Sequence, residues 1–176
     1  MEPVIVHLDI KPLNILMGKR SESGWIAKLA DFGLSVKKSN TIKTHTVERR
    51  LGFRAMAAVS RSGVLPTFLP AKLEPVGTPL HLAPELAQKL PYNEKADIYS
   101  FGMLIWETIT RKRLHEECQA QNQSVYTIFI PQIPANVPEQ LASLMRACWN
   151  ENSWSRPSIS SVLDTLNDIS EEEWDK

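Results

Sequence analysis

Two short polar motifs stand on either side of a predicted β-hairpin near the beginning of this sequence. The first spans residues 7–14 and reads His-Leu-Asp-Ile-Lys-Pro-Leu-Asn, and the second is Asp-Phe-Gly at 31–33. Residues 15–17 and 25–30 form two apolar runs, separated at 18–24 by a polar turn that contains glycine, which predicts strand, turn and strand. Because a hairpin brings its two open ends together, we expect Asn14 and Asp31, 17 residues apart in the sequence, to be neighbours in space.

The second half of the sequence has the periodicity of helices. Residues 96–111 are apolar almost all round, which predicts a helix buried at the centre of the domain. After Pro138, which suits the first turn of a helix, apolar residues recur at positions that form one face. A further amphipathic helix is predicted to begin near Ser158 as its N-cap. The residues expected to face inward on it are Ile159, Val162, Leu163, Leu166 and Ile169.

Two other segments near the polar motifs have different patterns. Residues 4–6, Val-Ile-Val, are β-branched and predict a short strand that leads into the first motif. Residues 35–76 have no sustained hydrophobic period and contain several Lys, Arg, Ser, Thr and Pro residues. They therefore predict a long loop.

Composition narrows the class of protein. A chain of 176 residues that is 43% hydrophobic and 23% charged fits one globular domain with a real core. Twenty basic residues balance twenty acidic ones, so charge gives no argument for binding nucleic acid or a membrane. The longest apolar stretch, at 101–106, is far shorter than a membrane span. Cys118 and Cys148 lack metal-ligand spacing and predict reduced thiols, so we expect a cytoplasmic protein, or a nuclear one.

The residue types in the two polar motifs suit phosphoryl transfer, which needs an aimed nucleophile and neutralised phosphate charge. Asp9 can accept a hydrogen bond from a hydroxyl nucleophile, and Lys11, two residues along an extended segment, can neutralise phosphate charge. Asn14 and Asp31 offer hard oxygen ligands for Mg²⁺. Gly33 would permit the backbone turn that lets Asp31 face the metal.

These motifs, in this order, resemble those of the eukaryotic protein kinases. Further matches are Gly-Thr-Pro-Leu-His-Leu-Ala-Pro-Glu at 77–85, Asp-Ile-Tyr-Ser-Phe-Gly at 97–102, and Cys-Trp at 148–149 with Arg-Pro at 156–157. The resemblance covers nearly everything except 35–76, and its last two blocks are similar to the tyrosine-kinase-like group of serine/threonine kinases. It implies an α+β, protein kinase-like fold: a mainly helical C-terminal lobe with a small β-hairpin at the catalytic loop.

The resemblance also implies a nucleotide site and two cofactors, ATP and Mg²⁺. Asp9 would be the catalytic base, and Lys11 would contact the γ-phosphate. Asn14 and Asp31 would be the Mg²⁺ ligands. Leu16 would form part of the floor of the adenine pocket.

Other residues take supporting roles by the same resemblance. Thr78 would bridge the lysine and the catalytic aspartate beneath the incoming hydroxyl, and this lysine–threonine pairing is the serine/threonine pattern. His7 would be structural and would pack near the Asp-Phe-Gly motif. Glu85 and Arg156 would form a buried ion pair, and Asp97 would cap the backbone of the catalytic loop.

The sequence departs from the family pattern in three places. Leu8 replaces the arginine that ordinarily pairs with a phosphate on the activation loop, so we expect activity of the intact kinase not to need that phosphate. The segment between the second motif and Ala-Pro-Glu is longer than the family norm. No Gly-x-Gly-x-x-Gly occurs in the sequence, and no lysine lies on a strand in the context that holds the α- and β-phosphates.

We therefore expect residues 1–170 to be a partial kinase domain that lacks the N-terminal lobe. In this interpretation 35–76 is a long activation-segment loop and 171–176 is an acidic tail. The face left by the missing lobe would be apolar, and a protein partner would cover it. The substrate of the kinase would be another protein.

Three hypotheses remain open. The chain is part of an ATP-dependent serine/threonine protein kinase, or a kinase-derived, catalytically inactive module that binds another protein, or a fragment that does not fold alone. Retention of the four polar residues of the two motifs favours the first as a statement of family. We expect little or no phosphotransfer from the 176 residues by themselves.

Overall fold

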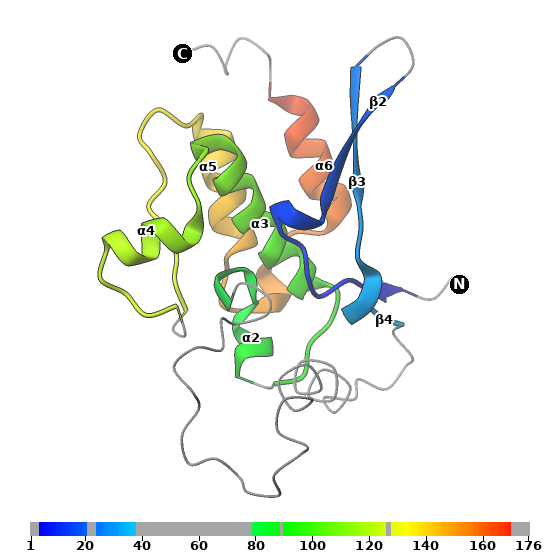
Figure 1. The fold of residues 1–176 in the computed structure, drawn as a ribbon, viewed down its shortest axis with the longest axis horizontal. Helices are drawn as coiled ribbons and strands as arrows, with labels where there is room; N and C mark the ends of the chain where they lie inside the picture. Colours follow the sequence, from blue (N-terminus) through cyan, green and yellow to red (C-terminus); the bar gives the residue numbers. More distant parts are fainter. Residues whose placement is uncertain (1–3, 21–23, 38–78, 89, 126–127, 170–176) are drawn as a thin grey trace, which may run out of the picture.

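The computed structural model describes residues 4–20, 24–37, 79–88, 90–125 and 128–169. Two small antiparallel sheets are followed by helices, so the architecture is α+β, as predicted (Figure 1). The strands are β1 (Ile5–Val6), β2 (Ile15–Arg20), β3 (Gly24–Leu29) and β4 (Val36–Lys37). The α-helices are α2 (Pro84–Ala87), α3 (Lys95–Thr110), α4 (Leu114–Ala120), α5 (Glu139–Cys148) and α6 (Ile159–Asp168). Single 3-10 turns are η1 (Pro12–Asn14), η2 (Phe32–Leu34), η3 (Pro79–His81) and η4 (Ser153–Ser155).

The predicted hairpin is present, and its first strand, β2, is longer than expected. β2 and β3 pair in register from Ile15 opposite Leu29 to Arg20 opposite Gly24. Residues 18–20, which were expected in the turn, continue β2 because each has a cross-strand partner on β3. Gly24 has φ 130°, a conformation that residues with a Cβ rarely adopt, so glycine is suited to the start of β3.

The second sheet corrects the expected start of the long loop. β1 confirms the predicted strand, and it pairs antiparallel with β4, with Val6 opposite Val36. The loop predicted from residue 35 therefore begins with a short strand, because the backbone of β4 finds hydrogen-bond partners on β1. Residues 38–76 of that loop and the expected acidic tail at 171–176 lie outside the described residues.

α3 is the central helix, as its all-round apolar sequence predicted. Trp106 and Met103 are buried, and the indole Nε1 of Trp106 donates a hydrogen bond to the Gln132 carbonyl at 2.9 Å. α5 packs very closely on α3 at Gly102. A Cβ added at Gly102 would lie 2.7 Å from Cβ of Cys148, so only glycine allows this approach of the two helices.

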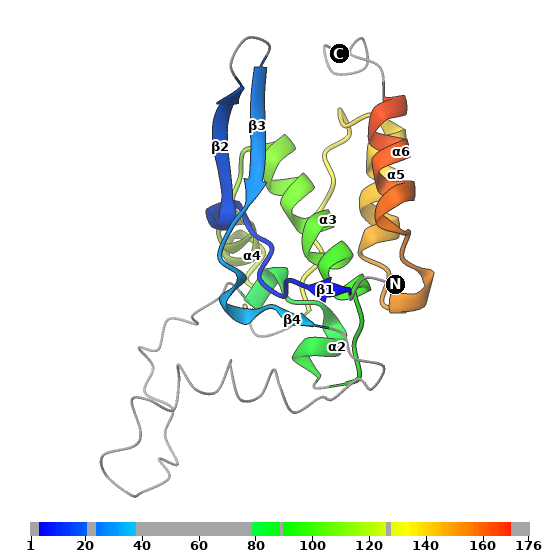
Figure 2. The same cartoon turned by 90° about the vertical axis from the view of Figure 1, so that its right-hand side faces the viewer.

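α6 packs beside α5 at the outside of the molecule, whereas the hairpin lies on the other side of α3 (Figure 2). The predicted N-cap is confirmed, since Oγ of Ser158 accepts a hydrogen bond from the Ser161 amide. Of the residues expected to face inward, Val162 and Ile169 are buried, but Ile159 and Leu163 are exposed. The prediction failed for Ile159 and Leu163 because the rest of the domain packs against a narrower face of α6 than the apolar sequence suggested.

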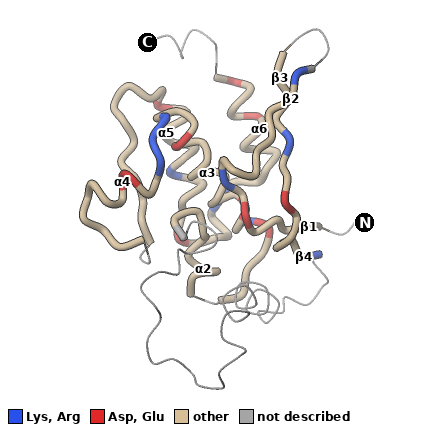
Figure 3. The backbone as a smooth tube through the Cα atoms, viewed as in Figure 1, with Lys and Arg blue, Asp and Glu red and all other residues tan. Residues whose placement is uncertain are grey.

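Charge is spread along the described backbone, with acidic and basic residues interspersed (Figure 3). A basic run at 111–113 connects α3 to α4. Within the described ranges, no helix combines the length and apolar character needed to cross a membrane.

Candidate active site

One carboxylate of α3, that of Asp97, holds the start of the 7–14 loop in place. Asp97 accepts the His7 amide on Oδ2 at 2.7 Å and the Leu8 amide on Oδ1 at 2.8 Å. Leu8 has φ 69°, in the left-handed region that is strained for a residue with a Cβ, and its side chain is buried in the core. Burial raises the pKa of Asp97, and the two backbone hydrogen bonds oppose that rise. Asp97 therefore fixes an unusual backbone conformation at the start of the loop.

His7 joins this loop to the end of the hairpin. Its ring is buried, with Nδ1 3.3 Å from the Asp9 amide and Nε2 3.1 Å from the Ala30 carbonyl. Because the Asp9 amide is a donor, Nδ1 must accept, and the proton of the neutral ring lies on Nε2. The ring also packs edge-on against Phe32, with centroids 4.7 Å apart. His7 thus contacts the residues on both sides of Asp31.

Asp9 is the centre of a small polar cluster. Its Oδ2 lies 2.9 Å from Nζ of Lys11 and accepts a hydrogen bond from Nδ2 of Asn14, also at 2.9 Å. Nδ2 of Asn14 donates a second hydrogen bond to the Asp9 carbonyl at 2.7 Å. Both partners of Nδ2 are acceptors, which fixes the amide orientation and leaves Oδ1 of Asn14 to bind a cation. The contacts use Oδ2 of Asp9, so Oδ1 can accept from an incoming hydroxyl.

Asp31 differs from the expected geometry in one respect. The left-handed residue at this turn is Asp31 itself, with φ 61° and ψ 70°, and its Oδ1 accepts the Gly33 amide at 3.2 Å. The turn is therefore made at Asp31, and Gly33 itself has no positive φ. Glycine is favoured there because an added Cβ would lie only 2.9 Å from the Asp31 carboxylate.

The hairpin brings the two candidate cation ligands to the same end. The Ala30 amide donates to the Asn14 carbonyl at 2.9 Å, and Asp31 follows Ala30 directly. An amide oxygen and an exposed carboxylate fit Mg²⁺, which is commonly held by one or two side chains together with substrate phosphates. Leu16, one residue after the first register pair, is exposed on β2 and can contact a flat apolar group. Thr78 lies outside the described residues.

Comparison with known proteins decides the family. Residues 2–166 match the family model described as "Protein kinase domain". The chain belongs to the protein kinase family. Its helices and small sheets are consistent with the kinase-like α+β fold.

Relatives of this kinase domain include serine/threonine kinases. A protein of Acanthamoeba polyphaga mimivirus named as a serine/threonine-protein kinase/receptor is 33% identical over 171 residues, covering 94% of the chain and 8% of that relative. A dual specificity protein kinase of Dictyostelium discoideum is 33% identical over 174 residues (94% of the chain, 18% of the relative). A serine/threonine-protein kinase of Arabidopsis thaliana is 31% identical over 171 residues (95% and 17%). The chain thus spans less than a fifth of the length of these three relatives.

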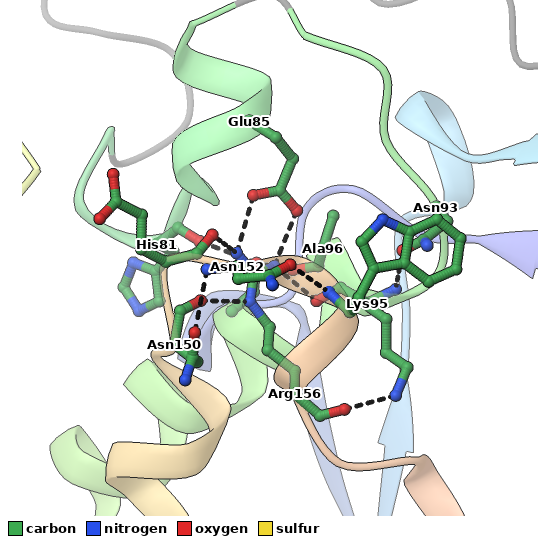
Figure 4. Close-up of polar contacts among 11 residues, drawn as sticks. His81, Glu85, Asn93, Lys95, Ala96, Asn150, Asn152 and Arg156 are labelled. Carbon is green, nitrogen blue, oxygen red and sulfur yellow. Dashed lines mark hydrogen bonds and ion pairs between the residues drawn. The ribbon is translucent and has the colours of Figure 1, made fainter.

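Away from the polar cluster, the kinase domain contains a buried arginine that joins α2, α3 and the connection between α5 and α6 (Figure 4). Nη1 and Nη2 of Arg156 lie 2.7 and 2.8 Å from the two carboxylate oxygens of Glu85 on α2. Arg156 also donates to the carbonyls of Asn150 and Lys95, and its guanidinium lies over the ring of Tyr99. This bidentate pair fixes α2 to Arg156, which is bound in turn to the Lys95 carbonyl at the start of α3.

A second buried polar pair escaped the sequence analysis. His81 on η3 and Glu107 on α3 are in contact, although 26 residues separate them in the sequence. The only sequence signal was a histidine between two leucines and a glutamate in a mostly apolar helix. A polar residue in an apolar context is often buried with a partner, but its partner cannot be read from periodicity.

Proposed function

We propose that this chain carries the phosphoryl-transfer residues of a serine/threonine protein kinase, which moves the γ-phosphoryl group of ATP to a protein hydroxyl. The arrangement of Asp9, with Lys11 and Asn14 both bound to one carboxylate oxygen, is the observation that supports it most. The serine/threonine kinases among the relatives favour the same chemistry.

In the proposed mechanism, Oδ1 of Asp9 accepts the hydrogen bond of the substrate hydroxyl and aims its oxygen for attack. Lys11, already beside Asp9, offsets negative charge that develops on the phosphoryl oxygens. Asn14 and Asp31 would hold Mg²⁺, which neutralises phosphate charge when it is bound. Asp97 and His7 take no part in the chemistry and keep the loop and the hairpin end in place.

Two further assignments belong to this proposal. Leu16 would contact the adenine ring, because it is an exposed apolar side chain near the end of the hairpin. Thr78 would bridge Lys11 and Asp9 beneath the hydroxyl, and the lysine–threonine pairing favours serine and threonine over tyrosine as acceptors. The buried side chain of Leu8, in the place of an arginine, favours activity without a phosphate on the activation loop.

A second candidate function is a kinase-derived module that binds another protein. The hairpin favours it, because Met17 and Trp25 are large apolar side chains that are mostly exposed. Exposed apolar surface of this kind marks interaction sites in many soluble proteins. If this function is the main one, charge-changing substitutions on the hairpin would abolish partner binding while substitutions at Asp9 would not.

The test of the first proposal is phosphotransfer from labelled ATP to a generic protein substrate in the presence of Mg²⁺. We expect little or no turnover from the 176 residues alone, since no glycine-rich loop occurs in their sequence. In a completed kinase, with a glycine-rich loop and strand lysine upstream, Asp9→Ala and Asp31→Ala should each lower turnover roughly a hundredfold or more. Asp164→Ala on the exposed face of α6 is the matched control and should leave turnover unchanged. Equal turnover in all three variants would refute the assignment.

A further inference from the structure

We propose that His81 is a positioning residue, and that with Glu107 it forms a buried clasp holding residues 79–87 against α3. Nε2 of His81 lies 3.0 Å from Oε2 of Glu107, and the two side chains are only 8% and 10% exposed. The residues between 79 and 87 follow directly on Thr78. The clasp stands on its own geometry, whereas its effect on substrate binding rests on the proposed function.

One carboxylate of the clasp connects three segments. Oε2 of Glu107 contacts His81, and Oε1 accepts the amide of Leu114, the first residue of α4, at 2.8 Å. The His81 carbonyl in turn accepts a hydrogen bond from Oγ of Ser100 at 2.8 Å. Both the side chain and the backbone of His81 are therefore bound to α3, and Glu107 joins this contact to the start of α4.

The geometry also assigns the proton on the ring. Nδ1 of His81 is buried and has no hydrogen-bond partner in the part of the chain that the structure describes. A doubly protonated ring would bury an Nδ1–H group without an acceptor, which is costly. The favoured form is neutral, with the proton on Nε2 as the donor to Glu107. His7 differs, because both of its ring nitrogens have partners.

The clasp and the Glu85–Arg156 pair attach residues 79–87 to the rest of the domain at two points. The arginine pair is a bidentate contact between full charges, and it anchors α2. The clasp uses one donor from a neutral ring and anchors η3, next to Thr78 in the sequence. Losing the Nε2 donor would leave a carboxylate oxygen of Glu107 buried without that partner, so the segment should loosen at its first residues.

Three variants test this inference by amide hydrogen exchange in the 176-residue chain. His81→Phe keeps a ring but removes the donor, and should speed exchange at residues 80–83 and at Leu114 by about tenfold or more. His81→Gln restores an Nε2 donor and should bring exchange back to within about threefold of the parent. The matched control, His115→Phe, makes the same substitution at an exposed histidine of α4 and should change neither region.

Unchanged exchange in His81→Phe, or no recovery in His81→Gln, would overturn the proposal. The tautomer gives a separate measurement on the unsubstituted chain: long-range proton–nitrogen spectra of the imidazole should show a neutral ring protonated at Nε2. A ring protonated at Nδ1 would also overturn it, even if the phenylalanine variant did not fold.

A kinetic measurement separates the clasp from the proposed function. Where phosphotransfer is observed, His81→Phe should raise KM for the protein substrate while KM for ATP stays the same, and His81→Gln should reverse the effect. An extended kinase that includes a glycine-rich loop and strand lysine but shows no turnover would count against the proposed function, and the exchange and tautomer results would still decide the clasp.

Discussion

Helix α3 and the β2–β3 hairpin carry the same kinds of apolar side chain in opposite surroundings. Met103 and Trp106 on α3 are 0% and 1% exposed, whereas Met17 and Trp25 on the hairpin are 60% and 72% exposed. Burial of large side chains is the main source of stability, so α3 should determine whether the chain folds. The hairpin contributes little packing, and its open end depends on individual hydrogen bonds. Nε2 of His7 donates to the Ala30 carbonyl, and Nδ2 of Asn14 donates to Asp9.

The largest expected effect is the contrast between the two tryptophans. Trp106→Ala should cost about 3–5 kcal/mol of unfolding free energy, because it removes a fully buried side chain and leaves a cavity. Trp25→Ala should change stability by less than about 0.5 kcal/mol, since it trims an exposed side chain. Urea unfolding of both variants measures the difference, and similar losses would show that the hairpin belongs to the cooperative core.

A pair of glycines sharpens the same comparison at a smaller scale. Gly102→Ala should cost about 1–3 kcal/mol, because the added Cβ would lie 2.7 Å from Cβ of Cys148 on α5. Gly18→Ala on β2 should cost less than about 0.5 kcal/mol, since the nearest atom, Cγ2 of Ile26, would be 3.6 Å away. The midpoints of thermal unfolding report both changes, and a tolerated alanine at 102 would contradict the close packing of α3 on α5.

The contact between α3 and the 7–14 loop should depend on pH. Burial raises the pKa of Asp97 in the folded chain, so the folded chain binds this proton more tightly than the unfolded chain does. The stability that protonated Asp97 contributes is therefore present at low pH. It is lost as pH rises from the ordinary aspartate range through the raised pKa of Asp97. Unfolding free energies measured against pH should fall more steeply in the parent than in Asp97→Asn, and parallel curves would contradict the burial of this carboxylate.

The smallest expected effect concerns the end of α3. Arg111 caps the helix with φ 55°, a conformation that glycine adopts without strain, and its side chain is exposed. Arg111→Gly should therefore raise the unfolding free energy by about 0.5–1 kcal/mol. The matched variant Arg113→Gly, at a residue with φ −93°, should give no gain. A loss in Arg111→Gly would mean that its side chain makes a stabilising contact.

Local patterns were enough to predict the hairpin, the central helix and the Ser158 cap. Each depends on neighbours within a few residues, where turn chemistry and hydrophobic period act directly. The family resemblance assigned Asp9, Lys11 and Asn14 to one site, and the structure shows these three residues in contact.

The errors and omissions have a different physical origin. The left-handed residue of the Asp-Phe-Gly segment is Asp31, and no local sequence pattern distinguished Asp31 from Gly33 in this respect. The inward face of α6 depends on which helices cover it. The contact between His81 and Glu107 depends on the path of 26 residues between them, which no local period encodes.

The most direct measurement of the central claim is paramagnetic broadening in the 176-residue chain, with Mn²⁺ replacing Mg²⁺ in the presence of ATP. If Asn14 and Asp31 share one cation at the open end of the hairpin, the amide signals of residues 14 and 31–33 should broaden first. Asp31→Asn should remove that broadening, whereas Asp164→Asn should not. Broadening that begins elsewhere in the chain, or that persists unchanged in Asp31→Asn, would contradict the proposed site.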